Sequence, residues 1–169
     1  MINKLELVKG FDDYVKSHDW DIFFSTTFRK LTKTITIIQD KQPKEVRVWL
    51  NGIPSMRKEL QYFFSHLNYV VNFVDKYMLA LICFERQYKG APIHIHALIK
   101  GISPQFCRIL KSESYEFFGE SEVKPYDSTK PVSFYFGWKY LKSELVDFDF
   151  LRINSRRRKK PKRRWEVIV

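Results

Sequence analysis

The pattern of apolar and polar residues along the first half of the chain predicts three strands followed by a helix. Segment 20–28 is rich in aromatic residues and threonine, which favour strands. Short strands are expected at 34–38 and 45–50, separated by polar, turn-forming residues. Apolar residues then recur at the spacing of one helical face over 54–72, and a proline begins this segment at a position that helices tolerate.

The second half of the chain predicts further strands and helices. Strands at 78–85 and 93–100 are separated by a short stretch with glycine and proline, which indicates a hairpin. A short helix is expected from Ser103, a weaker strand over 117–124, and a helix with a narrow apolar stripe over 131–145. These elements predict an α+β domain with a central, largely antiparallel β-sheet of about five strands, flanked by helices.

The positive charge of the chain is concentrated at one end. The 169 residues carry a net charge of +11, but nine of the 30 basic residues lie in 152–164, which contains no acidic residue. The other 21 basic residues nearly balance the 19 acidic ones. We therefore expect one domain over 1–150 and a disordered basic tail over 151–169. Such a tail contacts nucleic-acid phosphates, and a solubilising tail or targeting signal is the alternative.

Composition excludes several classes of protein. A chain with 44% hydrophobic and 29% charged residues is neither a disordered polymer nor a collagen. The only two cysteines, Cys83 and Cys107, form no CxxC pair, which indicates a reducing compartment. The first residues contain no apolar leader, and no apolar run approaches the roughly 18 residues of a membrane span. We expect a soluble intracellular protein without a membrane partner.

Two histidines two residues apart are the most informative candidates for chemistry. Alternate side chains of a strand share one face, so His94 and His96 point the same way if 93–100 is a strand. Glu85 ends the preceding strand and the turn brings it close to them. Two imidazoles and a carboxylate suit Mn²⁺ or Mg²⁺, and also Zn²⁺ or Fe²⁺. The alternatives are two ordinary half-buried histidines and a surface ion pair between Glu85 and an arginine.

The helix over 131–145 carries the other candidates. Tyr135 and Tyr140 lie on opposite flanks of its apolar stripe, with Lys139 between them in sequence. A tyrosine beside a core stripe is commonly an amphipathic packing residue. It becomes a nucleophile where lysines or a metal-bound phosphate favour its anion. The remaining histidines, His18 and His66, lack such neighbours and are interpreted as structural.

These residues resemble the motifs of HUH endonucleases, specifically rolling-circle replication initiators. The run E-x4-G-x3-H-x-H over 85–96 resembles motif 2, FFSTTF at 23–28 resembles motif 1, and WKYLK at 138–142 resembles motif 3. All three occur in the family's order. The resemblance implies an RRM-like, sheet-centred nicking domain in which Glu85, His94 and His96 hold Mn²⁺ or Mg²⁺. It also implies a tyrosine that attacks DNA, forms a 5′-phosphotyrosine link and frees a 3′-hydroxyl primer.

The third motif does not decide which of the two tyrosines is the nucleophile. Alignment on Lys139 and Tyr140 makes Tyr140 the nucleophile and places Phe136 where the family usually has a tyrosine or an acidic residue. Tyr135 is the alternative, because it shares a helical face with Lys139. Lys139 is expected to hold the phosphate in either register.

The resemblance also implies the substrate and partners. The expected substrate is single-stranded origin DNA or an extruded hairpin, gripped by aromatic stacking and cations. The chain has no GxxxxGK[ST] loop, so a host helicase and polymerase are expected partners, in the cytoplasm of a bacterial or archaeal host or the nucleus of a eukaryotic one. The alternatives are a single-tyrosine HUH transposase or relaxase, and a non-catalytic module that binds single-stranded nucleic acid.

Overall fold

The computed structural model describes residues 4–27, 32–39, 42–49, 53–71, 73, 76–86, 92–130 and 145–154. The elements in these ranges, in chain order, are α1 (Lys4–Lys16), β1 (Ile22–Thr27), β2 (Thr32–Gln39), β3 (Gln42–Trp49), α2 (Ile53–Val70), β4 (Tyr77–Glu85), β5 (His94–Lys100), a 3-10 turn (Pro104–Phe106), α3 (Cys107–Phe118), β6 (Ser121–Pro125) and β7 (Leu145–Asn154).

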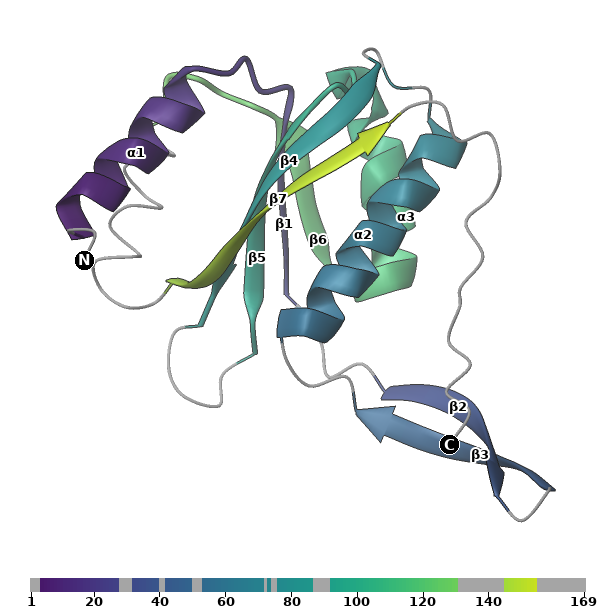
Figure 1. Ribbon diagram of the computed structural model, residues 1–169. Coiled ribbons are helices and arrows are strands. Elements are labelled where there is room, and N and C mark those ends of the chain that lie inside the picture. Colours follow the sequence, from purple (N-terminus) through teal and green to yellow (C-terminus); the bar gives the residue numbers. More distant parts are fainter. Residues whose placement is uncertain are drawn as a thin grey trace.

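A five-stranded antiparallel sheet forms the centre of the molecule (Figure 1). Its strand order is β6-β1-β5-β4-β7, and β2 pairs with β3 in a separate two-stranded hairpin. The helix α1 lies on one side of the sheet, whereas α2 and α3 lie on the other. The predicted α+β class, with a largely antiparallel sheet of about five strands flanked by helices, is therefore confirmed.

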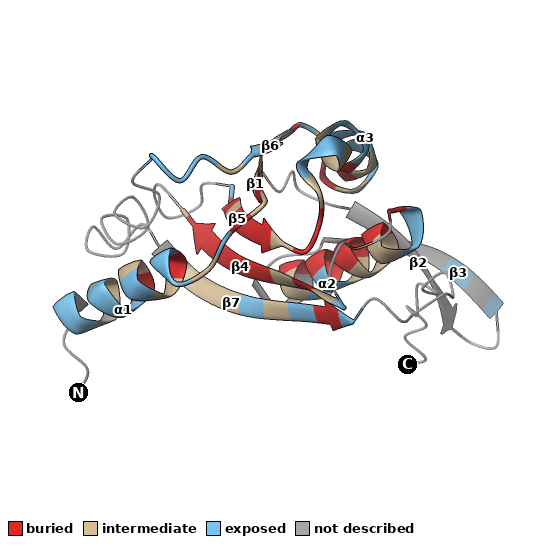
Figure 2. Cartoon of the chain, turned by 90° about the horizontal axis from the view of Figure 1, so that it is seen from above, coloured by how far each residue is buried: buried red, intermediate tan, exposed pale blue. Residues whose placement is uncertain are grey.

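The main core fills the face of the sheet that α2 and α3 cover. Figure 2 shows buried positions concentrated on β4, β5 and the facing side of α2. The fully buried Phe24 ring of β1 stacks with Phe63 of α2, at 5.8 Å between ring centroids. It also meets Phe118 of α3 edge to face at 6.4 Å. Much of the aromatic surplus of the chain thus belongs to this core.

The opposite face carries a smaller core beneath α1, a helix that is absent from the predicted elements. Phe11 and Val15 of α1 join Leu81 of β4 in this core, and the Trp20 indole nitrogen donates to the Val15 carbonyl oxygen at 2.9 Å. Phe11 also meets Phe148 of β7 edge to face at 4.8 Å. Val8, Phe11 and Val15 recur at the spacing of one helical face, so the periodicity of α1 is present in the sequence although the predicted elements omit this helix.

Strand β7 was also missing from the predicted elements. Residues 146–150 alternate between apolar and acidic, a strand pattern that the predicted elements omitted. One arginine of α2 holds the two aspartates. The Arg57 guanidinium forms ion pairs with Asp147 at 2.9 Å and Asp149 at 3.1 Å. The strand continues to Asn154 and so extends four residues past the boundary predicted between domain and tail. Its exposed end leads directly into the basic segment.

Two other predicted elements compare with the structure as follows. The strand expected over 117–124 is shifted, because residues 117 and 118 end α3 and β6 begins at Ser121. Residues 131–144 of the predicted helix lie outside the described ranges, and Leu145 already belongs to β7. Among the described helices, none combines the length and apolar character that a membrane span requires.

Candidate active site

The central strand β5 carries both motif histidines between β1 and β4. His94 pairs with Glu85 of β4 on one side and with Thr27 of β1 on the other. His96 is two residues further along the same strand and is half-buried, as is His94, whereas the intervening Ile95 is fully buried in the main core. The alternation therefore places both imidazoles on the face of the sheet opposite α2 and α3, as predicted.

Glu85 and His96 are in direct contact across the β4–β5 ladder. The Glu85 Oε1 atom lies 2.9 Å from His96 Nε2. The side chains are 8% and 14% exposed respectively, so this is a buried pair and not a surface ion pair. A buried carboxylate is costly unless it is hydrogen-bonded or bound to a cation. The contact supplies one such partner.

His94 is held by the neighbouring strand. Its Nδ1 atom lies 2.9 Å from the Thr27 hydroxyl oxygen, on the strand β1. Because this hydrogen bond uses Nδ1, the Nε2 atom is the nitrogen available to a metal. Thr27 is a residue that the sequence did not single out, although it lies within the FFSTTF run. Its importance depends on β1 and β5 being neighbours.

The Cys83 thiol next to the Glu85–His96 pair is not ionised. Cys83 pairs with His96 across the ladder and lies on the same face as Glu85. Burial raises the pKa of the Cys83 thiol well above its ordinary value, and the nearby Glu85 carboxylate raises it further. The thiol is therefore protonated at neutral pH and adds no charge beside the Glu85–His96 pair.

The Glu85–His96 pair offers two of the donor types that a divalent cation binds, a carboxylate oxygen and an imidazole nitrogen. The 2.9 Å between Oε1 and Nε2 is the distance of an ordinary hydrogen bond. A cation would replace the proton that these atoms share. In the described ranges, however, no three His, Cys, Asp or Glu side chains are grouped closely enough to hold a metal. The structure thus brings two of the predicted ligands into contact and holds the third, His94, on Thr27.

The predicted nucleophiles lie outside the described residues. Tyr135, Lys139 and Tyr140 belong to the segment 131–144. Of the described residues at its two ends, one lies beside a motif histidine and the other beside Glu85. Lys130 lines a pocket together with His96, and Leu145 pairs with Glu85 across β4 and β7.

The other two histidines have structural contacts, in agreement with their interpretation from the sequence. His66 Nε2 lies 2.8 Å from Glu113 Oε2 and joins α2 to α3. His18 Nδ1 lies 3.0 Å from the Tyr14 carbonyl oxygen at the end of α1, and the His18 ring packs beside Trp20. Neither contributes to the Glu85–His96 pair.

Comparisons with known proteins do not add a relative. A scan against models of protein families, a search of curated proteins and a search of solved structures each found no match for this chain. The functional argument therefore rests on the residues and their geometry.

Proposed function

We propose that this chain is a replication-initiator endonuclease of the HUH kind, which nicks single-stranded or extruded origin DNA by tyrosine attack. The observation that carries the proposal is the buried Glu85–His96 pair at 2.9 Å, with His94 on the same face of the sheet. A buried acid and two imidazoles on adjacent strands are the donors that a divalent cation requires. The motif resemblance supports the same assignment.

The proposed reaction is a transesterification. The phenol oxygen of Tyr140, or of Tyr135, attacks the scissile phosphorus in line, and its proton leaves to a base or to water. The new bond joins this oxygen to phosphorus, while the bond from phosphorus to the 3′ oxygen breaks. The 3′ oxygen takes up a proton and becomes a hydroxyl primer, and the 5′ phosphate remains on the tyrosine. Lys139 holds the phosphate, and reversal rejoins the strands.

Glu85, His96 and His94, the last through Nε2, are the residues proposed to hold Mn²⁺ or Mg²⁺. The bound ion supplies Lewis-acid polarisation of the scissile phosphate. The role of the protein is to exclude water around a carboxylate that is 6% exposed and to fix the histidine tautomers.

Chain connectivity is compatible with tyrosine attack at this place. Tyr135 follows Lys130 by five residues, and Tyr140 precedes Leu145 by five. Five residues span at most about 18 Å. Because Lys130 lines the pocket beside His96 and Leu145 pairs with Glu85, each tyrosine is within about 18 Å of chain from a residue beside the proposed metal ligands.

The proposal also includes the partners of the protein and its location in the cell. The sequence contains no phosphate-binding loop for a helicase motor, so the proposed partners are a host helicase, unless the origin is already single-stranded, and a host polymerase that extends the nicked strand. The proposed location is where the replicating DNA lies, in the cytoplasm or, in a eukaryotic host, the nucleus. A transposase or relaxase of the same chemistry remains the alternative within the class.

A second candidate function is a non-catalytic module that binds single-stranded nucleic acid. The observation that favours it is the closed Glu85–His96 hydrogen bond together with the engagement of His94 by Thr27, because histidines satisfied by protein partners need no metal. On this reading the aromatic and basic residues bind the strand and no bond is broken.

A covalent-adduct assay separates the two functions. The protein is mixed with end-labelled single-stranded DNA from its own replicon and Mn²⁺, and the products are run on a denaturing gel. We expect a labelled protein–DNA adduct with Mn²⁺ and none with EDTA, because the phosphotyrosine bond survives denaturation. Binding without any adduct on every DNA tested would support the non-catalytic module and contradict the endonuclease.

Removal of one hydroxyl tests whether Thr27 positions a metal ligand. We expect Thr27→Val to weaken Mn²⁺ binding about 10- to 100-fold, because partners that orient ligating histidines have effects of that size. Mn²⁺ affinity is measured by the electron paramagnetic resonance signal of the free ion. Thr27→Ser keeps the hydroxyl that meets His94 Nδ1 and should restore the affinity.

The matched control for Thr27 is its neighbour on the other face of β1. Thr26 is buried and donates to the Glu120 carbonyl oxygen, away from the histidines. Thr26→Val should lower thermal stability but leave Mn²⁺ affinity unchanged. Equal Mn²⁺ affinity in Thr27→Val and the wild type would show that Thr27 does not orient a ligand.

A further inference from the structure

A small pocket adjoins the histidine pair on the same face of the sheet. It has a volume of about 250 Å³. Its lining includes His96 of β5, Phe23 of β1, Lys124 of β6, and Tyr126 and Lys130 from the segment that follows β6. His96 is thus both a proposed metal ligand and a wall of this pocket, so whatever binds in the pocket lies directly beside the proposed metal.

Aromatic rings line the pocket, and a cation lies over the face of one of them. The Phe23 ring lies 5.9 Å from the His96 ring, centroid to centroid, at an interplanar angle of 32°. Lys124 Nζ lies 5.0 Å from the centroid of the Phe23 ring. Glu122 holds Lys124 by an ion pair of 2.6 Å. An apolar ring surface and a fixed ammonium group therefore lie side by side.

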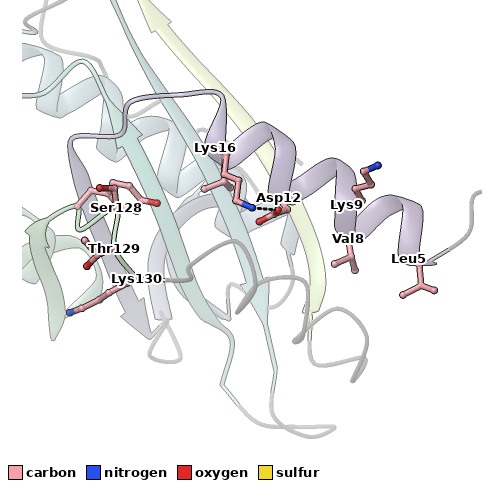
Figure 3. A pocket seen from close by; sticks show the side chains of 10 residues that line it. Leu5, Val8, Lys9, Asp12, Lys16, Ser128, Thr129 and Lys130 are labelled. Carbon is pink, nitrogen blue, oxygen red and sulfur yellow. Dashed lines mark hydrogen bonds and ion pairs between the residues drawn. The ribbon is translucent and has the colours of Figure 1, made fainter.

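A larger hollow continues from this pocket along α1. It has a volume of about 500 Å³ and shares Tyr126 and Lys130 with the pocket. Figure 3 shows the side chains of α1 on one side of this hollow and those of residues 128–130 on the other. The two cavities form one continuous depression that runs from His96 to the helix.

The hollow is the basic part of this depression. It is lined by three lysines, Lys9, Lys16 and Lys130, and by one carboxylate, Asp12, which pairs with Lys16. Leu5 of α1 contributes an apolar surface that is 64% exposed. In the smaller pocket the charges are balanced, because Glu122 pairs with Lys124 and Asp127 with Lys130. With each lysine counted once, Lys9 adds a positive charge to the hollow beyond the Lys16–Asp12 and Lys130–Asp127 pairs, so attraction for a polyanion acts mainly there.

The volume and lining residues of the depression indicate which kind of ligand it binds. Pockets for drug-sized molecules have volumes of about 300–1,000 Å³, so the 250 Å³ pocket suits a single nucleobase. Rings for stacking, followed by lysines along a groove, are what single-stranded nucleic acid needs for binding. Because the narrow end is formed by His96, a base in the pocket belongs to a nucleotide next to the scissile phosphate.

We propose that the depression between His96 and α1 is the binding track for the single-stranded DNA substrate. One base stacks on Tyr126 and Phe23 in the pocket, and the backbone phosphates beyond it lie along Lys130 and Lys9. This inference rests on the proposed endonuclease function, whose substrate it positions. It also assigns a function to α1, a helix that is absent from the predicted elements.

Metal-free binding tests the track separately from cleavage. Fluorescein-labelled dT12 and an abasic 12-mer of equal charge are titrated with the protein in EDTA, and binding is followed by fluorescence anisotropy. Tyr126→Leu keeps the apolar bulk of the side chain but removes the ring. We expect it to weaken dT12 binding about 5- to 100-fold, the range found for loss of one stacked base, and to leave binding of the abasic strand unchanged.

The matched control is Tyr115→Leu. Tyr115 lies on α3, behind the opposite face of the sheet, and is 62% exposed. It should bind dT12 like the wild type. Equal losses in the two variants, or no loss in a Tyr126→Leu protein with a normal circular-dichroism melting curve, would overturn the base pocket.

Lysine substitutions test the phosphate path. Lys9→Gln and Lys130→Gln should each lower the slope of the logarithm of the association constant against the logarithm of salt concentration by about 0.7, the value for one phosphate contact on a single strand. Lys111→Gln on α3 is the control and should leave the slope unchanged. Equal slopes in all three variants and the wild type would overturn the track.

The two proposals fail in distinguishable ways. A protein that binds dT12 through Tyr126 and the two lysines but forms no adduct with Mn²⁺ would retain the track and refute the endonuclease. A protein that forms the adduct while the variants of Tyr126, Lys9 and Lys130 bind normally would retain the endonuclease and refute the track.

Discussion

His96→Gln is expected to reduce covalent-adduct formation at least about 100-fold relative to the wild type. Removal of a residue that only hydrogen-bonds to a metal ligand costs about 10- to 100-fold in metal affinity or activity. The loss of adduct should be larger here, because His96→Gln removes a proposed metal ligand itself. Glutamine is preferred to alanine because its amide still donates to the buried Glu85 carboxylate, which alanine would leave without the contact at 2.9 Å. The measurement is adduct yield on a denaturing gel across a Mn²⁺ titration.

The matched control for His96→Gln is the same substitution on the far side of the sheet. His66 bridges α2 and α3 through Glu113, so His66→Gln changes one helix contact without touching the site. It should form the adduct at the wild-type Mn²⁺ concentration. If His96→Gln also kept the wild-type yield and Mn²⁺ dependence, the metal role of the Glu85–His96 pair would be wrong.

Tyr140→Phe is expected to abolish the adduct, with a loss of at least about 1,000-fold. The substitution removes only the oxygen that forms the bond to phosphorus, and loss of a nucleophile commonly costs more than this factor. Tyr135→Phe should retain most of the adduct. A spacing of five residues places the two rings about 140° apart on a helix, so one attacking tyrosine is expected and not two.

The same gel distinguishes the alternatives for the nucleophile. Loss in Tyr135→Phe with retention in Tyr140→Phe would assign the attack to Tyr135, the residue that shares a helical face with Lys139. An adduct that survives both substitutions would refute tyrosine attack in this segment. Metal-free binding to dT12 is measured in both variants, so that loss of the adduct is distinguished from loss of DNA binding.

The contact between Glu85 and His96 was predictable because it depends on local pattern. The strands that carry them are uninterrupted apolar runs, and glycine and proline mark the turn between them. The structure places these strands at Tyr77–Glu85 and His94–Lys100, within one residue of the predicted ends. Strand alternation then requires that the two histidines share a face. Antiparallel pairing through a short turn brings the acid next to them.

The hydrogen bond between Thr27 and His94 was not predictable in the same way. It exists because β1, which is 67 residues away in sequence, is the neighbour of β5 on its other side. The order of strands is decided by how the whole sheet buries its faces under α2 and α3. No local pattern around Thr27 contains that information.

The α+β class, the histidine strand and the candidate ligands could be predicted from the amino-acid sequence, through its alternating side chains and turn residues. These features follow from interactions between near neighbours in the chain. The position of α1 on the sheet, the place of β7 at its edge and the depression beside His96 were not accessible in this way. Phe11 and Val15 of α1 pack with Leu81 of β4, and Arg57 of α2 binds the aspartates of β7. These features depend on contacts between distant segments, which form only when the chain is folded.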